Sequence, residues 1–296
     1  MNINPLKGKD KPTMKNFDHE CYPVALTIAG SDSGGGAGIQ ADLRTFNAFG
    51  VFGCSAITAI TSQNPLAVRR IDPLPPEAVA AQLAAVFEAV QIGCIKTGML
   101  GGAATIQAVA EGLTNRPCKL VVDPVMVATS GARLLPDEAL EVLRTVLLPL
   151  ADWLTPNLPE AELLLGRPLR QRDEMRRGAQ ECAERWQCSC VLKGGHAAGD
   201  RDNAVDIVAH DGKLYELSSP RIAVEKYCDH GTGCTFSAAL AAGLALDMPW
   251  KKALASAKGF VLGSLAEAVQ IGPKLQAMYP PEEAWYDRVE LRRITI

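Results

Sequence analysis

Several features that mark common classes of protein are missing from this chain of 296 residues. Basic residues are not in excess, because the formal net charge is -3, and we therefore expect no binding to nucleic acid. The longest apolar runs are too short and too rich in alanine to cross a bilayer, so no membrane association is expected. Residues 1–20 carry lysines without an apolar segment behind them, which excludes a secretory signal and leaves a cytoplasmic location as the expectation.

Histidine is scarce and the cysteines are scattered. The chain contains four histidines and nine cysteines, and no two cysteines form a C-x-x-C pair. Zinc ribbons and zinc fingers need closely spaced ligands, so the lack of such spacing disfavours a zinc site. Reduced thiols in a cytosolic protein are the simpler interpretation of these cysteines.

Short apolar segments of strand type alternate with helical segments through most of the chain. This alternation predicts an α/β fold in which helices cover both faces of a mostly parallel central sheet. At residues 203–217 two alternating segments flank Asp211-Gly212, a turn signal that predicts an antiparallel hairpin at the sheet edge. No repeat and no linker divides the chain, so we expect a disordered tail at residues 1–20 and a single domain at 21–296.

Three boundaries follow from residue type. Residues 55–61 are rich in isoleucine and threonine and predict one strand, with Gln63 directly behind its end and Pro65 halting it. A helix is expected over residues 250–269. Beyond Pro273 prolines, acids and arginines are mixed, and no function is assigned to that segment.

The stretch at residues 229–240 carries the sharpest chemical signal. Gly231 and Gly233 flank Thr232, and their lack of a Cβ lets the backbone turn sharply next to a ligand. The alanine- and leucine-rich run that follows predicts a buried helix, whose first N–H groups attract phosphate. Cys234 stands at the helix start, where thiol pKa values fall. A phosphoryl-transfer site is one interpretation, and an ordinary glycine turn before a buried helix with a buried cysteine is the other.

A second glycine-rich loop, at residues 30–38, follows an apolar strand at residues 24–29. Gly36-Ala37-Gly38 begins a partial match to the dinucleotide-binding fingerprint. The acidic residue expected about 20 positions later is absent, which disfavours a nicotinamide site. No Lys-Ser or Lys-Thr closes the loop as in a P-loop, so we expect a donor-rich loop that wraps a small ligand.

Polar or glycine-rich segments directly follow six of the predicted strands. Parallel α/β sheets bind ligands outside the carboxyl ends of their strands, so these segments predict one composite site. They are the glycine loop, Gln63, Gly98-Met99, Asp123-Pro124, Asn157 with Glu160, and Lys193-Gly194-Gly195.

Each of these residues also has an ordinary interpretation. A carboxylate at Glu160, three residues after Asn157, suits hydrated Mg²⁺, and the same spacing suits a capping box at a helix start. Asp123 is a metal or phosphate partner or a turn residue, and Lys193 is a phosphate contact or a solvated lysine. The Gln63 amide suits the edge of an aminated ring. Met99 and Val125 would form apolar walls beside that ring, or simply pack in the core.

The motifs, taken in order, resemble those of the hydroxymethylpyrimidine and phosphomethylpyrimidine kinases of thiamine biosynthesis. The resemblance covers roughly residues 24–269, and the motifs are specific together although each is weak alone. They lie at residues 29–42, 58–64, 96–100, 123–126, 155–160 and 230–235.

The resemblance implies a ribokinase-like fold and two successive ATP-dependent phosphorylations, first of the pyrimidine hydroxymethyl group and then of the monophosphate. It implies ATP and Mg²⁺ as cofactors, and a small-molecule pyrimidine and a second copy in a homodimer as partners. Cys234 is then the base or the group that orients the substrate hydroxyl, while the N–H groups of Gly231, Thr232 and Gly233 hold the transferring phosphoryl. The remaining implied residues are Gly30, Asp32, Ala37, Asp42, Gln63, Met99 and Val125 for the pyrimidine, Asn157, Lys193 and Thr232 for ATP, and Asp123 and Glu160 for the metal.

Two alternatives stay open. A pyridoxal kinase with the same cysteine would phosphorylate a similar hydroxymethyl ring, and a non-catalytic pyrimidine-binding regulator would keep the pocket without ATP turnover. The chain also departs from the commonest form of the family, because Cys228-Asp229 replaces Asn-Thr before the histidine. An acid there raises the thiol pKa or repels phosphate, so the nucleotide contacts are the least secure part of the resemblance.

Overall fold

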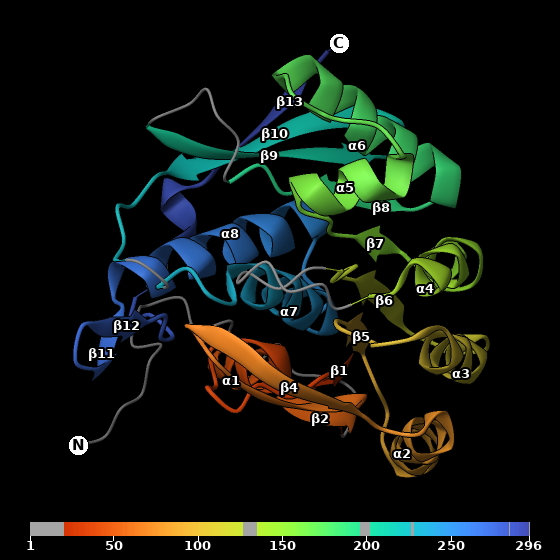
Figure 1. Cartoon of the computed structure of the whole chain (residues 1–296). Coiled ribbons are helices and arrows are strands. Elements are labelled where there is room, and N and C mark those ends of the chain that lie inside the picture. The colour runs from red at the N-terminus through yellow and green to blue at the C-terminus, as the bar shows by residue number, and fades with distance from the viewer. Residues whose placement is uncertain (1–20, 127–134, 196–201, 226–227, 284, 296) are drawn as a thin grey trace.

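The computed structural model describes residues 21–126, 135–195, 202–225, 228–283 and 285–295. A nine-stranded sheet runs through the molecule in the order β13-β10-β9-β8-β7-β6-β5-β1-β2 (Figure 1). Strands β8, β7, β6, β5, β1 and β2 run parallel to one another. Strands β9, β10 and β13, at the other end of the sheet, each pair in an antiparallel way. The parallel strands are β1 (Val24–Ala29), β2 (Phe52–Ile57), β5 (Cys94–Thr97), β6 (Lys119–Val122), β7 (Trp153–Leu154) and β8 (Ser189–Leu192).

The antiparallel part begins with the hairpin expected from the sequence. Strands β9 (Asn203–His210) and β10 (Lys213–Pro220) flank Asp211 and Gly212, whose φ values of 48° and 66° suit the right-handed twist of a tight hairpin. Strand β13 (Glu290–Ile294) then pairs with β10 and forms the sheet edge. This edge strand was missed because its polar residues lack the apolar alternation of a buried strand.

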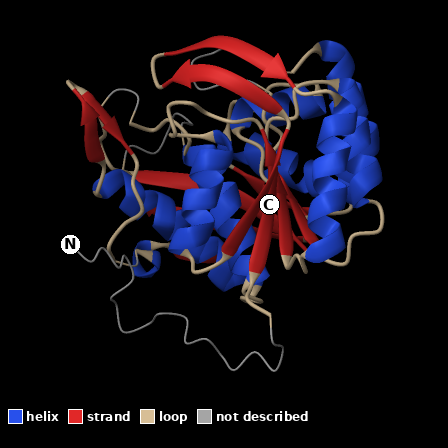
Figure 2. Ribbon diagram, turned by 90° about the horizontal axis from the view of Figure 1, so that it is seen from below, coloured by secondary structure: helices blue, strands red, loops and turns tan. Residues whose placement is uncertain are grey.

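Helices cover both faces of the sheet, as expected (Figure 2). Three helices pack against one face of the sheet and share one hydrophobic core with it. Five helices pack against the opposite face and form a second hydrophobic core. The first group is α1 (Gly38–Ala48), α7 (Thr232–Ala245) and α8 (Trp250–Ala266), and the second is α2 (Pro76–Ala89), α3 (Ala103–Leu113), α4 (Asp137–Val142), α5 (Leu158–Leu165) and α6 (Arg172–Trp186). Among the described residues, no helix has the length and apolar character needed to span a membrane.

Helix α7 is buried on all sides. Every residue from Thr235 to Ala245 is buried, and the helix contacts α1, α8 and strands β1, β5 and β6. Small alanine side chains let it fit between two helices and the sheet. The prediction of a buried helix after the glycine turn is confirmed.

The expectation of one strand at residues 55–61 was wrong. Strand β2 ends at Ile57, and the chain leaves the sheet at Thr58 to form a separate two-stranded antiparallel arm of β3 (Ala59–Asn64) and β4 (Ala67–Pro73). Gln63 therefore lies within β3 of this arm and not behind a strand of the central sheet. Thr58 anchors the departure, because its Oγ1 donates to the Met99 carbonyl at 2.7 Å.

The expected helix over residues 250–269 is shorter than predicted. Helix α8 ends at Ala266, and the chain continues into a small hairpin of β11 (Val269–Gly272) and β12 (Leu275–Ala277). The glycines on both sides of the helix end, Gly263 and Gly272, did not reveal the boundary from sequence alone.

Candidate active site

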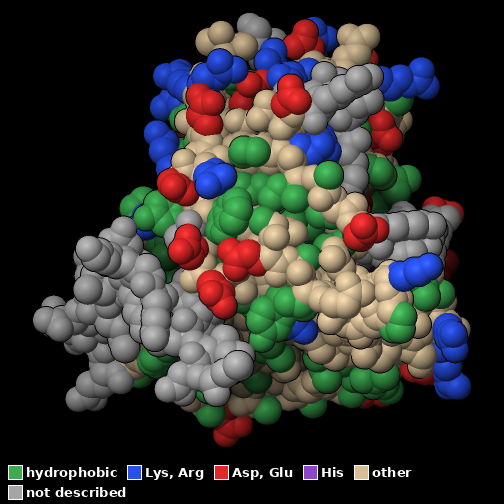
Figure 3. Space-filling model, turned by 90° about the vertical axis from the view of Figure 1, so that its left-hand side faces the viewer, with side chains coloured by type: hydrophobic (Ala, Val, Ile, Leu, Met, Phe, Trp, Pro, Cys, Tyr) green, Lys and Arg blue, Asp and Glu red, His purple; other side chains and the backbone are tan. Residues whose placement is uncertain are grey.

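The loops that follow the parallel strands meet on one side of the molecule. Figure 3 shows this side, where hydrophobic side chains gather at the centre and acidic side chains lie next to them. The two glycine-rich stretches singled out from the sequence come together here. Gly231 takes the left-handed φ of 86°, and a Cβ at this position would collide with the Gly36 carbonyl oxygen. Only glycine allows this close approach of the two loops.

Asp32 ties the same two loops together. Its carboxylate accepts hydrogen bonds from the N–H groups of Gly34 (2.8 Å) and Ala37 (2.7 Å), and one oxygen lies 3.0 Å from Nε2 of His230. Burial opposes ionisation of this carboxyl, but the bonds from His230, Ala37 and Gly34 hold its pKa below the usual value. The sequence analysis placed His230 in a motif without assigning it a role.

The β3–β4 arm is joined to the first glycine loop. Ser33 Oγ donates to the Gln63 carbonyl at 2.6 Å and accepts from the Gln63 N–H at 2.8 Å. Nearby, the Gly30 N–H donates to the Met99 carbonyl at 3.1 Å, and a Cβ at Gly30 would meet the Met99 side chain. Four of the residues expected to hold the pyrimidine, Gly30, Asp32, Gln63 and Met99, thus belong to one connected group of loops.

Cys234 lies in the first turn of α7, where it is partly buried. Its sulfur receives a hydrogen bond from the backbone N–H of Gly38, at the start of α1. Burial raises the pKa of this thiol to about 11, and Lys96 acts in the opposite direction. The expectation that the helix start lowers the thiol pKa was therefore wrong, because desolvation of a thiolate outweighs the nearby positive charges.

Lys96 is a buried cation next to this thiol. It is fully buried on β5, and its Nζ bonds both oxygens of Asp42 at 3.0 and 2.8 Å. Asp42 is equally buried and also accepts from Thr27 Oγ1 at 2.6 Å. Although burial disfavours a charged amine, Asp42 and Cys234 raise the pKa of Lys96. A lysine within a short apolar strand is the one signal in the sequence of the buried charge pair at this place.

Lys193 brings a second cation to the same place. Its Nζ donates to Asp123 Oδ1 at 2.8 Å and lies 3.1 Å from where a Cβ of Gly233 would be. Burial opposes the charge, but Asp123 and Glu160 raise the pKa of Lys193. Lys96 and Lys193 therefore both lie close to the start of α7, Lys96 near Cys234 and Lys193 near Gly233.

Asn157 and Glu160 form the capping box that the sequence analysis considered. The Glu160 N–H donates to Asn157 Oδ1 at 2.9 Å, and the Asn157 N–H donates to Glu160 Oε2 at 2.8 Å. Burial raises the pKa of Glu160 to about 7; Lys193 lowers it, and Asp123 raises it further. Glu160 therefore caps the helix and also lies near the Asp123 carboxylate.

The N-terminal end of α7 can receive an anion. Thr232 N–H donates to the Asp229 carbonyl at 3.2 Å and Thr235 N–H to the Gly231 carbonyl at 2.9 Å. The Thr232 N–H is thus already bonded to a backbone carbonyl, whereas the sequence motifs implied that it holds phosphate. The N-terminus of a helix carries a partial positive charge, and each lysine amine carries a full one. Together these charges favour binding of a phosphoryl group.

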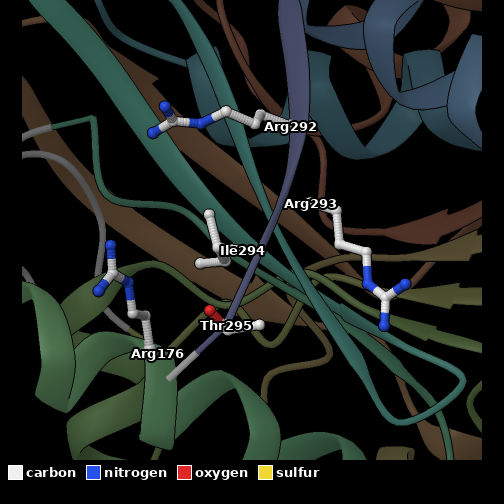
Figure 4. Close-up of a pocket in the computed structure, with 5 residues that line it drawn as sticks. All are labelled: Arg176, Arg292, Arg293, Ile294 and Thr295. Atoms are coloured by element: carbon white, nitrogen blue, oxygen red, sulfur yellow. The ribbon is translucent and has the colours of Figure 1, made fainter.

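A hollow of about 650 Å³ lies elsewhere, beside the outermost strand β13 and helix α6 (Figure 4). Arg176 and Arg292 line it and bond the Glu216 carboxylate at 2.9 and 3.0 Å. No strand-end loop of the parallel sheet contributes to it, so its chemistry is separate from that at α7. The remaining lining residues are Arg293, Ile294 and Thr295.

Sequence relatives identify the family to which this geometry belongs. The phosphomethylpyrimidine kinase family model matches residues 32–279 of the chain. The hydroxymethylpyrimidine/phosphomethylpyrimidine kinase of Haemophilus influenzae is 46% identical over 250 residues, which cover 83% of this chain and 92% of the relative.

Solved structures agree in fold. The pyridoxal kinase from Staphylococcus aureus in complex with AMP-PCP and pyridoxal matches with a TM-score of 0.78 and 33% identity, over 93% of this chain and 100% of that one. The phosphomethylpyrimidine kinase from Clostridium difficile 630 matches with a TM-score of 0.70 and 39% identity, over 80% and 97% of the two chains. These matches confirm the ribokinase-like fold expected from the sequence motifs. The chain belongs to the phosphomethylpyrimidine kinase family, that of the hydroxymethylpyrimidine/phosphomethylpyrimidine kinases of thiamine biosynthesis.

Proposed function

We propose that this chain uses ATP to phosphorylate 4-amino-5-hydroxymethyl-2-methylpyrimidine and then the resulting monophosphate. The observation that carries the proposal is the thiol of Cys234 at the start of α7, with Lys96 and Lys193 both close to that start. Phosphoryl transfer depends mainly on positioning and on stabilising charge, and this arrangement supplies both.

The pyrimidine would lie between the first glycine loop and the β3–β4 arm. Gln63 would pair with the aminopyrimidine edge, and Gly30, Asp32 and Ala37 would form the loop around it. Met99 and Val125 would supply apolar contacts to the ring. Asp42 would support this pocket from the protein interior, because it is fully buried and bonded to Lys96 and Thr27.

Cys234 would orient the substrate hydroxyl or accept its proton. With a thiol pKa of about 11 in the ligand-free protein, the neutral thiol dominates at pH 7 and the orienting role is favoured. The hydroxyl oxygen would form a bond to the γ-phosphorus of ATP as the bond from that phosphorus to the bridging oxygen breaks and ADP leaves. The hydroxyl proton would pass to an oxygen of the transferred phosphoryl group, or to the Cys234 sulfur if the thiol is ionised. The N–H groups at Gly231 and Gly233 and the Lys193 amine would face the transferring group, whereas the Thr232 N–H is held by the Asp229 carbonyl.

The residues present fit a Mg²⁺ ion held together with ATP. Within the described part of the chain no three acidic, histidine or cysteine side chains form a closed metal cage. Mg²⁺ commonly takes only one or two carboxylates and completes its shell with phosphates and water. Asp123 and Glu160 are such a pair, since the Asp123 carboxylate lies close enough to Glu160 to raise the pKa of Glu160. Bound Mg²⁺ would neutralise charge on the phosphates, while Asn157, Lys193 and Thr232 would hold the nucleotide.

Three further features of the protein belong to this proposal. We place it in the cytoplasm because all nine cysteines are free thiols. Residues 21–296 would act as a single kinase domain, with residues 1–20, which lie outside the described residues, as a tail. A homodimer is supported by the apolar side chains of Phe52, Ile60 and Leu66, which are 60%, 44% and 56% exposed on β2 and the arm.

Pyridoxal is the second candidate substrate. The observation that favours it is the TM-score of 0.81 to the Staphylococcus aureus pyridoxal kinase in complex with pyridoxal, at 31% identity. Identity to hydroxymethylpyrimidine/phosphomethylpyrimidine kinases is higher, at 46% for that of Haemophilus influenzae, so the pyrimidine is preferred here.

The first prediction concerns substrate choice. In an assay that couples ADP formation to absorbance, the wild-type protein should turn over hydroxymethylpyrimidine and its monophosphate at least tenfold more efficiently, by kcat/KM, than pyridoxal. A higher kcat/KM for pyridoxal would reverse the order of the two candidates, and ATP binding without turnover of any of the three would identify a non-catalytic regulator.

A second prediction separates chemistry from binding. Cys234→Ala should abolish phosphoryl transfer and leave the dissociation constant for the pyrimidine nearly unchanged, as measured by calorimetry. Gln63→Leu should do the opposite, weakening pyrimidine binding by roughly 1–3 kcal/mol because a buried ring polar group loses its partner. Cys188→Ala is the matched control, since Cys188 is also partly buried and lies just before β8. Turnover of Cys234→Ala at the wild-type rate would remove the thiol from the mechanism.

A third prediction tests the electrostatics of the thiol. Lys96 lowers and Asp42 raises the pKa of Cys234, so Lys96→Met should slow alkylation of Cys234 by iodoacetamide and Asp42→Asn should speed it. A shift of one pKa unit corresponds to a change of about tenfold in the thiolate fraction. The rate is followed at pH 8 by mass spectrometry of the peptide that contains Cys234. Both variants break the same ion pair, so a change of rate in the same direction in both would indicate loosening of the fold instead.

A further inference from the structure

A third ion pair with little solvent exposure lies next to the site described above. Asp206 on β9 and Lys258 on α8 are joined at 2.7 Å, and their side chains are only 4% and 9% exposed. The other carboxylate oxygen of Asp206 accepts the Gly194 N–H at 2.9 Å. One carboxylate thus links helix α8 to the turn at residues 193–195, which we call the lysine turn.

The lysine turn is fixed at four points, one of which is the Gly195 carbonyl, which accepts a hydrogen bond from Arg221 at 2.5 Å. The Lys193 N–H donates to the Pro156 carbonyl at 2.8 Å, and Lys193 Nζ donates to Asp123 at 2.8 Å. Both of these contacts lie among the strand-end loops of the site itself. The bond from Gly194 to Asp206 is the fourth contact and ties the turn to strand β9.

Gly194 packs so closely against β9 and α6 that no side chain fits at this position. A Cβ at this position would overlap the Val205 carbonyl oxygen and the end of the Met175 side chain. The backbone of the turn is therefore pressed against β9 and α6, with its N–H directed at the Asp206 carboxylate. Any shift of that carboxylate would be passed to Gly194 and then to the adjacent Lys193.

Lys258 has a defined part in this arrangement. A carboxylate with little solvent access needs a cation or several donors to remain ionised. Lys258 supplies the cation, so Asp206 can accept a strong hydrogen bond from Gly194 without adding net negative charge close to an anion site. An unpaired carboxylate at this position would oppose the approach of phosphates.

We propose that Asp206 and Lys258 are positioning residues that set the lysine turn, and hence the Lys193 amine, for ATP phosphates. Neither residue contacts the reacting atoms. The inference rests on the proposed role of Lys193 in nucleotide binding, and it extends that role to two residues to which the sequence motifs assign nothing.

The test uses the full-length protein and two readouts, the KM for ATP in the pyrimidine kinase assay and the Kd for AMP-PCP by calorimetry. Asp206→Asn keeps the shape of the side chain and an oxygen for Gly194, but leaves Lys258 without its counter-charge. Lys258→Met leaves the carboxylate unpaired. Each should raise the KM for ATP and the Kd for AMP-PCP about tenfold, since a small misplacement of a positioning group has effects of this order or larger. The Kd for hydroxymethylpyrimidine should stay within about twofold.

The double variant Asp206→Asn with Lys258→Met should recover part of the loss, because no unpaired charge remains. Glu216→Gln is the matched control, since Glu216 is a similarly buried carboxylate on the neighbouring strand β10 and is paired with Arg176 and Arg292, at 2.9 and 3.0 Å, instead of with the lysine turn. It should lower the melting temperature without changing the KM for ATP. If Asp206→Asn and Glu216→Gln lower the melting temperature alike and neither changes nucleotide affinity, the pair is structural only and the inference is overturned.

Failure of the proposed function gives a different result. If the wild-type protein binds AMP-PCP but does not turn over any pyrimidine, the calorimetric arm still tests Asp206, and weaker AMP-PCP binding by Asp206→Asn supports the inference. If Asp206→Asn binds AMP-PCP as tightly as the wild-type protein, the inference is contradicted, whether or not the wild-type protein turns over a pyrimidine.

Discussion

The burial of two lysines at the start of α7 is the constraint on which the rest of the site depends. A buried amine stays charged only if a carboxylate is held against it. Lys96 has Asp42 and Lys193 has Asp123, at 2.8 Å in both pairs. These partners come from α1 and from the segment after β6, so the ion pairs can form only when the sheet has its native strand order.

The charges around the thiol nearly cancel. Two lysines face Asp42 and Asp123, and Glu160, with a pKa of about 7, is only partly ionised near neutral pH. A site balanced in this way would suit a single phosphoryl group next to the helix N-terminus, whereas a triphosphate would bring more negative charge than the two lysines can offset. We infer that Asp123 and Glu160 serve the metal ion that enters with the nucleotide, and that their mutual repulsion in the free protein is relieved by it.

The sequence allowed the fold and the gathering of loops to be predicted, because both follow from local patterns. The helix after Gly231 is apolar throughout, and strands followed by glycine or polar residues place those residues at one edge of a parallel sheet. The β3–β4 arm escaped prediction because no glycine or proline separates residues 54 and 64, so nothing local signals that the chain leaves the sheet. The pKa of Cys234 escaped because the helix start is visible in sequence, whereas burial and the distances to Asp42 and Asp123 are set by tertiary packing.

The central claim is that the start of α7, with Lys96 and Lys193 close to it, holds the phosphoryl group during transfer. The most direct measurement is a crystal structure of the protein with hydroxymethylpyrimidine and AMP-PCP. The account predicts the γ-phosphoryl group within hydrogen-bond distance of the Gly233 N–H and of Lys193 Nζ, with the substrate hydroxyl facing Cys234. A γ-phosphoryl group bound away from α7, with the Cys234 sulfur remote from the pyrimidine, would contradict it.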